Sequence, residues 1–315
     1  MAESSHIKSY KDSLKSLDTE EHIDLFFYRP IGYVWTRLAM RLGVKPNAIT
    51  IAAIFLGLGA AVAFYFPDLG INVIGMLLLV WANSFDSADG QLARLTGQYS
   101  RLGRILDGLC GDIWFVAIYL AIIFRELNTS AFFSANPWTI WLLAVVTGIC
   151  HAKQAAMADY YRQFHLYFLK GEDRSELDTT DELRRRLKAL SWRRNFFAKL
   201  SLYFYSNYTA NQEVMTPAMQ KLRHAIRTYF PDGKPTVRFR HDFRQLSLPL
   251  MKYTNILSFN WRCIALFASL FIGQPWLYFV FELVVLNNLL VYMMLRHESI
   301  CRQMLLGIES GDYAN

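Results

Sequence analysis

The chain has 315 residues, of which 53% are hydrophobic and 15% aromatic. This composition disfavours a pair of ordinary soluble domains and favours a membrane protein. The formal net charge of +7 indicates contact with anionic lipid headgroups and not with nucleic acid, because the basic residues of membrane proteins gather on the cytosolic side. The four cysteines include no CxxC pair and so give no indication of a zinc site or a disulfide framework.

The first 27 residues are polar and charged. They lack the short apolar core and the small-residue cleavage site of a secretory signal. We therefore expect the start of the chain to stay in the cytosol.

Six apolar stretches are each long enough to cross about 30 Å of hydrocarbon. They lie at 48–66, 71–88, 105–124, 137–157, 253–273 and 275–295. The turns at 67–70 and 273–275 contain no Lys or Arg, whereas nineteen lie between Lys153 and Lys252. With six spans, all basic segments fall on one side of the membrane. The positive-inside rule then predicts that both termini face the cytosol.

Residues 163–247 form a basic polar insert between the fourth and fifth spans. Within it, Thr179 and Glu182 have the spacing of a helix-capping box, and apolar residues repeat at helical spacing after them. A second amphipathic stretch covers 217–230. The two stretches either lie on the membrane surface or pack on each other, and the sequence does not decide between these interpretations.

Carboxylates converge where the second span ends and the third begins. Asp86 and Asp89 share one helical face with Gly90 and Ala93, and Asp107 lies four residues after Gly103. A charge at the end of an apolar helix is costly, so these residues are functional candidates. The alternative is a set of solvated aspartates at helix ends.

Three carboxylates beside small residues suit a hard divalent cation, Mg²⁺ or Mn²⁺, with a phosphate-bearing ligand completing its coordination. Gly90, Ala93 and Gly103 leave room for a nucleotide diphosphate, and Arg94 offers a charge-assisted contact to phosphate.

This segment resembles the CDP-alcohol phosphotransferases (CDP-alcohol phosphatidyltransferases), whose signature is DxxDGxxAR, eight residues, then GxxxDxxxD. The matching residues are Asp86, Asp89, Gly90, Ala93, Arg94, Gly103 and Asp107. The resemblance also covers six spans, a cytosolic N-terminal amphipathic segment and "PNAIT" at 46–50, but not the insert.

The resemblance implies transfer of a substituted phosphate from a CDP-linked donor to an alcohol, with release of CMP. It implies that Asp86, Asp89 and Asp107 bind a divalent metal pair. It also implies that Asp86, Gly90, Ala93, Arg94 and Gly103 line the CDP site.

The signature's fourth aspartate, the base and a ligand of the second metal, should stand four residues after Asp107. Gly111 occupies that position and Asp112 follows it. Five helical residues place Asp112 about 140° around the helix from Asp107. Three explanations remain open: a π-bulge turns Asp112 into the site as base and metal ligand, the missing group comes from elsewhere, or the protein is a degenerate relative.

The fifth span carries a polar stripe of Asn255, Ser258 and Arg262. A charged residue inside the hydrocarbon is a functional candidate, so Arg262, with His151 and Lys153, is a candidate for binding a phosphate of the donor or the acceptor. The alternative is a structural ion pair of Arg262 with Glu282, which lies at a similar depth in the sixth span.

The sequence thus predicts an all-α integral membrane bundle of six transmembrane helices with a cytosolic active site. The expected segments are a cytosolic amphipathic N-terminus (1–45), four spans with the motif (46–162), a helical insert (163–247), two spans (248–297) and a cytosolic tail (298–315).

The expected enzyme uses Mg²⁺ or Mn²⁺ and transfers a substituted phosphate from CDP-diacylglycerol to inositol, inositol phosphate or glycerol phosphate, with release of CMP. The alternatives are transfer from CDP-ethanolamine to diacylglycerol or ceramide, and a non-catalytic relative. Expected partners are the donor, the acceptor and membrane lipids, without nucleic acid. The residues neither favour nor oppose a homodimer.

Overall fold

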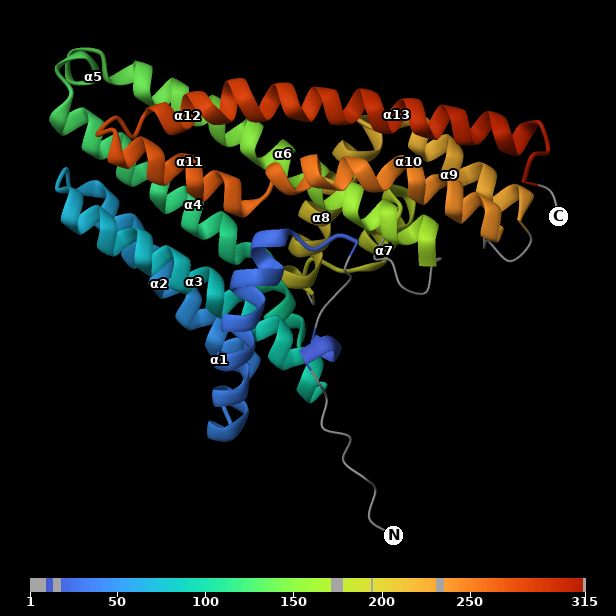
Figure 1. Cartoon of the computed structure of the whole chain (residues 1–315), viewed down its shortest axis with the longest axis horizontal. Coiled ribbons are helices and arrows are strands. Elements are labelled where there is room, and N and C mark those ends of the chain that lie inside the picture. Colours follow the sequence, from blue (N-terminus) through green and yellow to red (C-terminus); the bar gives the residue numbers. More distant parts are fainter. Residues whose placement is uncertain (1–9, 14–17, 171–177, 194, 231–234, 314–315) are drawn as a thin grey trace, which may run out of the picture. The chain divides into compact units, whose positions relative to one another are not determined.

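The computed structural model describes residues 10–13, 18–170, 178–193, 195–230 and 235–313, and these form helices without any strand (Figure 1). The chain divides into two compact units. Unit 1 comprises Met1–Cys150 and Phe259–Leu283, and unit 2 comprises His151–Ser258 and Val284–Asn315.

Unit 1 contains the N-terminal helices and a later pair. They are a π-helix at Asp24–Tyr28, α1 (Arg29–Leu42), α2 (Pro46–Tyr65), α3 (Leu69–Thr96), α4 (Arg101–Thr129), α5 (Ala131–Ala135), the first part of α6 (Pro137–Lys170), α11 (Phe259–Phe271) and α12 (Leu277–Phe281). Local sequence sets several ends. Asp68 caps α3 by accepting from Ile71 N at 2.8 Å, and Gly43 and Gly97 end α1 and α3 with positive φ angles, a conformation that favours glycine.

α2 packs against both α3 and α4, and α1 packs against α3 (Figure 1). Small residues on α2 allow this close approach, as in other membrane helix pairs. A Cβ added at Gly57 would lie 2.1 Å from the Trp114 ring, and Trp114 Nε1 donates to Ala53 O at 3.1 Å. Because Gly57 has no side chain, the Trp114 indole of α4 can pack directly against α2.

Arg125 on α4 satisfies the carbonyl groups at the C-terminal end of α2. Its Nη1 donates to Phe64 O, Phe66 O and Asn72 Oδ1, each at 3.1 Å. The last carbonyls of a helix have no partner within the helix, so Arg125 supplies one and ties the α2–α3 turn to α4.

Within the part of the chain that the structure describes, five helical segments are long and apolar enough to cross a membrane. They are Pro46–Tyr65, Leu69–Thr96, Leu106–Thr129, Pro137–Leu169 and Leu277–Glu309. They agree with five of the six expected spans, although the last begins two residues later than expected and runs further.

The expected span at 253–273 is not one continuous helix. α10 (Val237–Ile256) ends there, and the 13-residue α11 begins at Phe259. At 1.5 Å per residue α11 is about 20 Å long, shorter than the hydrocarbon layer. Ser258 stabilises the break, because its Oγ donates to Asn255 O at 2.6 Å. The six-span count stays a prediction.

Unit 2 contains the second part of α6, α7 (Thr180–Ala189), α8 (Phe196–Val214), α9 (Pro217–Tyr229), α10 and α13 (Asn287–Glu309). The capping box of Thr179 and Glu182 is present at the start of α7, as expected. The amphipathic stretch that follows is divided, since α7 ends before Leu190 and α8 begins at Phe196. α7 packs on α8, while α9 packs mainly on α13.

The N-terminus of α9 is capped from α13. Glu298 is buried, and its carboxylate accepts from Ala218 N at 2.7 Å and Met219 N at 3.3 Å. A carboxylate at this position satisfies helix N–H groups and complements the positive end of the helix dipole.

Candidate metal centre

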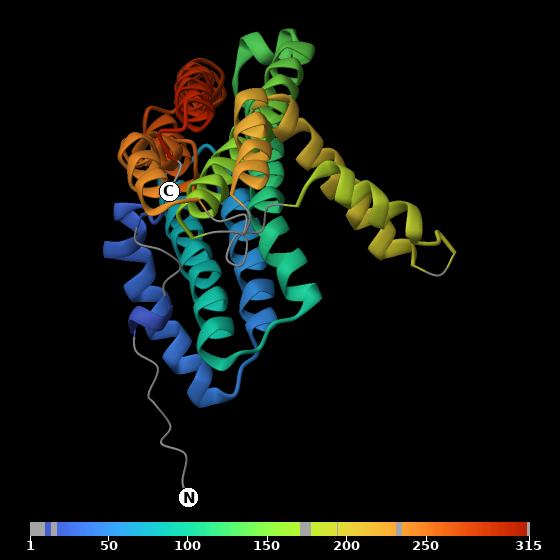
Figure 2. The same ribbon diagram turned by 90° about the vertical axis from the view of Figure 1, so that its right-hand side faces the viewer.

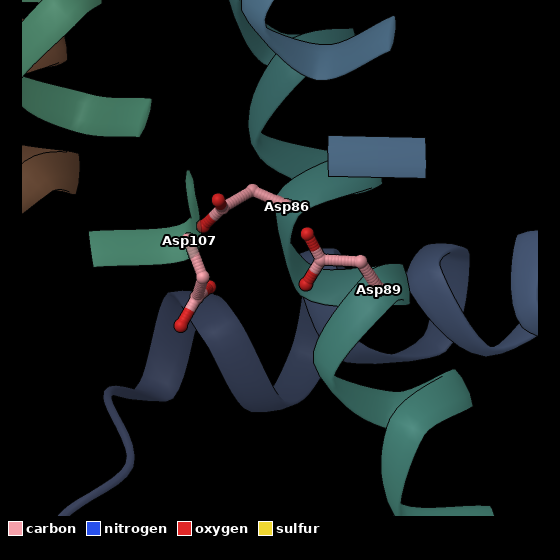
Figure 3. Close-up of side chains that lie close together, drawn as sticks. All are labelled: Asp86, Asp89 and Asp107. Carbon is pink, nitrogen blue, oxygen red and sulfur yellow. The ribbon is translucent and has the colours of Figure 1, made fainter. Parts of the chain in front are cut away.

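Asp86, Asp89 and Asp107 come together in unit 1. Figure 3 shows their carboxylates directed toward one space, two from α3 and one from α4. One oxygen of each residue lies within 4.8 Å of the others. The structure therefore places the three aspartates side by side, as the sequence predicts.

Asp89 is the most enclosed of the three, with 4% of its surface exposed, whereas Asp107 is exposed. Thr50 on α2 donates its hydroxyl to Asp89 Oδ2. This hydrogen bond fixes the orientation of a buried carboxylate. Thr50 belongs to the "PNAIT" segment, but the sequence did not assign it a role because only the fold brings α2 beside α3.

The start of α4 approaches the start of α2 closely at Gly103. A Cβ at Gly103 would lie 2.5 Å from Asn47 Oδ1. Ser100 links the same groups, since its Oγ donates to Asn47 Oδ1 at 3.0 Å and accepts from Gly103 N at 2.8 Å. The glycine thus positions the turn of α4 that leads to Asp107.

Arg94 lies beside the aspartates on α3. Its Nη1 would be 3.3 Å from a Cβ at Gly90, so the glycine leaves space for the guanidinium. Arg94 Nε donates to Ser13 O at 2.6 Å, and Nη2 is buried without a hydrogen-bond partner among the described residues. A buried guanidinium nitrogen with an unused proton is suited to a phosphate oxygen. Ala93 is half-buried one residue before it.

The donor set fits a hard divalent cation. Oxygen ligands of Mg²⁺ at about 2.1 Å lie at most about 4.2 Å apart, so the 4.8 Å spread requires only small side-chain rotations. Three carboxylates this close repel one another, and a cation would offset that repulsion. The observed groups are therefore compatible with Mg²⁺ or Mn²⁺.

Asp112 does not join this group of three. The π-bulge that the sequence left open as one explanation is absent here, because residues 107–112 lie within the regular helix α4. Asp112 is exposed, and a regular helix turns it about 140° from Asp107. A Cβ at Gly111 would meet nothing within 4 Å, so the position of the missing fourth aspartate has room for a side chain.

Arg262 forms the ion pair that the sequence left as an alternative. Its Nη1 lies 2.7 Å from Glu282 Oε1, and both side chains are almost fully buried. Glu282 also accepts hydrogen bonds from Tyr119 OH at 2.5 Å and from Tyr278 OH. The network joins α4, α11 and α12 and satisfies a charge inside an apolar region, as such a charge requires.

The other residues of the polar stripe bind Arg162 in unit 2. Arg162 Nη2 donates to Asn255 Oδ1 at 2.9 Å and to Ser258 Oγ at 2.7 Å. His151 is buried and Lys153 is exposed on α6 in the same unit. Binding of a phosphate by Arg262, His151 or Lys153 stays a prediction.

The segment that contains the three aspartates is similar to known proteins. Residues 44–164 match the family model for CDP-alcohol phosphatidyltransferase. The archaetidylinositol phosphate synthase of Pyrococcus horikoshii is 33% identical over 79 residues, which cover 25% of this chain and 40% of that protein. The chain thus matches less than half of that relative's length. The matched residues include the helices that carry all three aspartates, and residues 44–164 belong to the CDP-alcohol phosphatidyltransferase family.

Proposed function

We propose that this chain is a membrane enzyme of phospholipid synthesis, a metal-dependent CDP-alcohol phosphotransferase. It transfers a substituted phosphate from a CDP-linked donor to a polar alcohol and releases CMP. The observation that carries this proposal is the convergence of Asp86, Asp89 and Asp107 within the segment that matches the family.

Asp86, Asp89 and Asp107 would hold Mg²⁺ or Mn²⁺. When bound, such ions neutralise the diphosphate and stabilise the charge that develops on the leaving group. Thr50 orients Asp89, as a second layer of hydrogen bonds does at metal sites. Arg94 would offer a proton of Nη2, which has no hydrogen-bond partner among the described residues, to a phosphate oxygen. Gly90 leaves space for this guanidinium, and Gly90 and Gly103 would line the CDP site.

CDP-diacylglycerol is the proposed donor and an inositol phosphate the first proposed acceptor. The similarity to the archaetidylinositol phosphate synthase of Pyrococcus horikoshii favours inositol phosphate as the acceptor. Inositol and glycerol phosphate are the other acceptors to test. The main alternative is transfer of a headgroup from CDP-ethanolamine to diacylglycerol or ceramide.

The reaction also needs a group that accepts the proton of the attacking hydroxyl. Asp112 is the proposed base and a ligand of the second metal, although it is exposed on a regular helix. Asp112→Asn tests this role: a fall in the rate of transfer without a change in donor affinity supports it. An unchanged rate removes Asp112 from the mechanism and assigns proton removal to another group.

The proposed topology has six spans, with a cytosolic amphipathic N-terminal segment and with both termini and the aspartates facing the cytosol. The remaining crossing would lie at 253–273, where the helix is interrupted at Leu257 and Ser258. The positive-inside pattern supports this orientation. A homodimer and the absence of nucleic-acid binding stay predictions.

The donor is identified by supplying the full chain, reconstituted in vesicles, with radiolabelled CDP-diacylglycerol or CDP-ethanolamine. The proposal predicts release of CMP from CDP-diacylglycerol, dependent on added Mg²⁺ or Mn²⁺ and on inositol phosphate. Release from CDP-ethanolamine alone would support the alternative. Release from neither donor with any tested acceptor would reject the enzyme.

A further inference from the structure

Helix α8 carries four large aromatic side chains that are exposed in part on one face. Phe204 is 63% exposed, Phe196 51%, Tyr203 46% and Tyr208 38%. At about 100° per residue these four side chains fall within an arc of about 140°. Four large aromatic side chains on one exposed face are more than the scattered apolar residues of an ordinary surface.

The opposite face of α8 is buried and polar contacts hold it in place. Ser206 and Thr209 are 2% and 3% exposed. Gln212 Nε2 donates to Ala156 O at 2.8 Å on α6, and Glu213 accepts from Thr180 N at 3.1 Å at the start of α7. The aromatic face therefore points outward because the other face is fixed within unit 2.

Basic residues adjoin this aromatic face. Residues 184–199 contain seven Lys or Arg and no Asp or Glu. Arg184, Arg185 and Lys188 are exposed on α7 and fall within about 100° of one another. Leu183, on the other side of α7, is buried, which leaves the basic side of the helix outward.

α7 and α8 form a hairpin, and Figure 2 shows them side by side and extending away from α9. Between them, Trp192 is 47% exposed and Arg193 is exposed. Lys199 stabilises this connection, because its Nζ donates to Leu190 O at 2.7 Å and lies 5.1 Å from the Trp192 ring centroid. A tryptophan and an arginine thus lie beside the basic and aromatic faces.

We propose that the α7–α8 hairpin docks on an anionic phospholipid surface. Aromatic side chains favour the headgroup region of a bilayer, and clusters of Lys and Arg are attracted to anionic lipids. The exposed faces combine both properties, and the chain carries membrane-spanning helices that keep a bilayer nearby. The hairpin lies outside the family match at 44–164, so docking is independent of the proposed transfer reaction.

A fluorophore on α8 measures docking in the full chain. Phe204→Cys is labelled in a Cys150→Ser background, because the remaining cysteines, Cys110, Cys263 and Cys301, are buried. The labelled protein is placed in nanodiscs that contain a quencher on the lipid headgroup region. The discs contain either phosphatidylcholine alone or phosphatidylcholine mixed with phosphatidylglycerol.

The proposal predicts quenching in anionic discs, weak quenching in neutral discs and loss of the difference at high salt. Substituting Arg184, Arg185 and Lys188 by Gln should lower the equilibrium constant for docking on the anionic surface by about fivefold per charge removed. The control substitutes Arg296 and Arg302 by Gln, two exposed residues of α13, and should retain quenching; it is compared with the double variant Arg184→Gln and Arg185→Gln, which removes the same number of charges. Size-exclusion chromatography of each variant verifies that it folds.

Three results would overturn the proposal. The first is equal quenching in neutral and anionic discs, and the second is equal quenching in the two sets of charge variants. The third is quenching that requires two protein copies in one disc, which would assign the surface to a second copy of the chain. Loss of CMP release with docking retained would instead count against the proposed function alone.

Discussion

Replacing Thr50 by valine removes one hydrogen bond from the candidate metal centre while keeping the shape of the side chain. Thr50 donates to the buried carboxylate of Asp89. A hydrogen bond to a charged group contributes about 1.5–3 kcal/mol, and loss of an outer partner of a metal ligand lowers affinity or activity by about 10–100-fold. The two magnitudes agree, because each 1.4 kcal/mol corresponds to about tenfold.

The assay is Mn²⁺ binding and metal-dependent CMP release by the reconstituted full chain. Thr50→Val should weaken Mn²⁺ binding by about 10–100-fold, and Thr50→Ser should restore most of it because serine keeps the hydroxyl. The matched control is Thr36→Val. Thr36 donates to Ala88 O at 3.0 Å, one residue before Asp89, and does not contact the carboxylate.

The reasoning is refuted if Thr50→Val binds Mn²⁺ as tightly as the wild-type chain. It is also refuted if Thr36→Val and Thr50→Val weaken binding equally, because the effect would then come from packing of α3 and not from orientation of Asp89.

Three further predictions concern packing and the missing aspartate. Glu282→Ala leaves Arg262 buried without its partner and should destabilise the protein by about 3–5 kcal/mol, measured as a lower midpoint of thermal unfolding in detergent; an unchanged midpoint would show that the ion pair contributes little. Gly57→Leu places atoms where the Trp114 ring lies, so the variant should lose the monodisperse peak in size-exclusion chromatography. A monodisperse peak like that of the wild-type chain would contradict the tight α2–α4 contact. Gly111→Asp fills open space at the position of the signature's fourth aspartate and should increase CMP release without lowering the unfolding midpoint; unchanged CMP release would indicate that another group, such as Asp112, already supplies the base.

The sequence predicts the aspartate cluster well because helical geometry determines most of it. Asp86 and Asp89 are three residues apart on one helix, and only the pairing of α3 with α4 is needed to add Asp107. The capping box at Thr179 was predictable for the same reason, since a local spacing fixes its contacts.

Contacts between distant helices were not predictable from one sequence. Mean hydropathy over 253–273 does not distinguish a continuous helix from one that breaks at Ser258. The side chain that donates a hydrogen bond to Ser258 belongs to Arg162, which is 96 residues away. The cap of α9 by Glu298, 80 residues from Ala218, has no local signal either. The π-bulge near Asp112, one of three explanations that the sequence left open, does not form in α4, because glycines permit a distortion without requiring it.

Binding of a divalent cation by the three aspartates is the central claim, and Mn²⁺ binding followed by electron paramagnetic resonance tests it most directly. Asp107 is exposed, so Asp107→Asn should leave the fold intact while removing one ligand. Glu309→Gln, at another exposed acid, is the control. We predict that Asp107→Asn abolishes both tight Mn²⁺ binding and metal-dependent CMP release, while Glu309→Gln preserves both. Equal Mn²⁺ binding by the wild-type chain and Asp107→Asn would contradict the account.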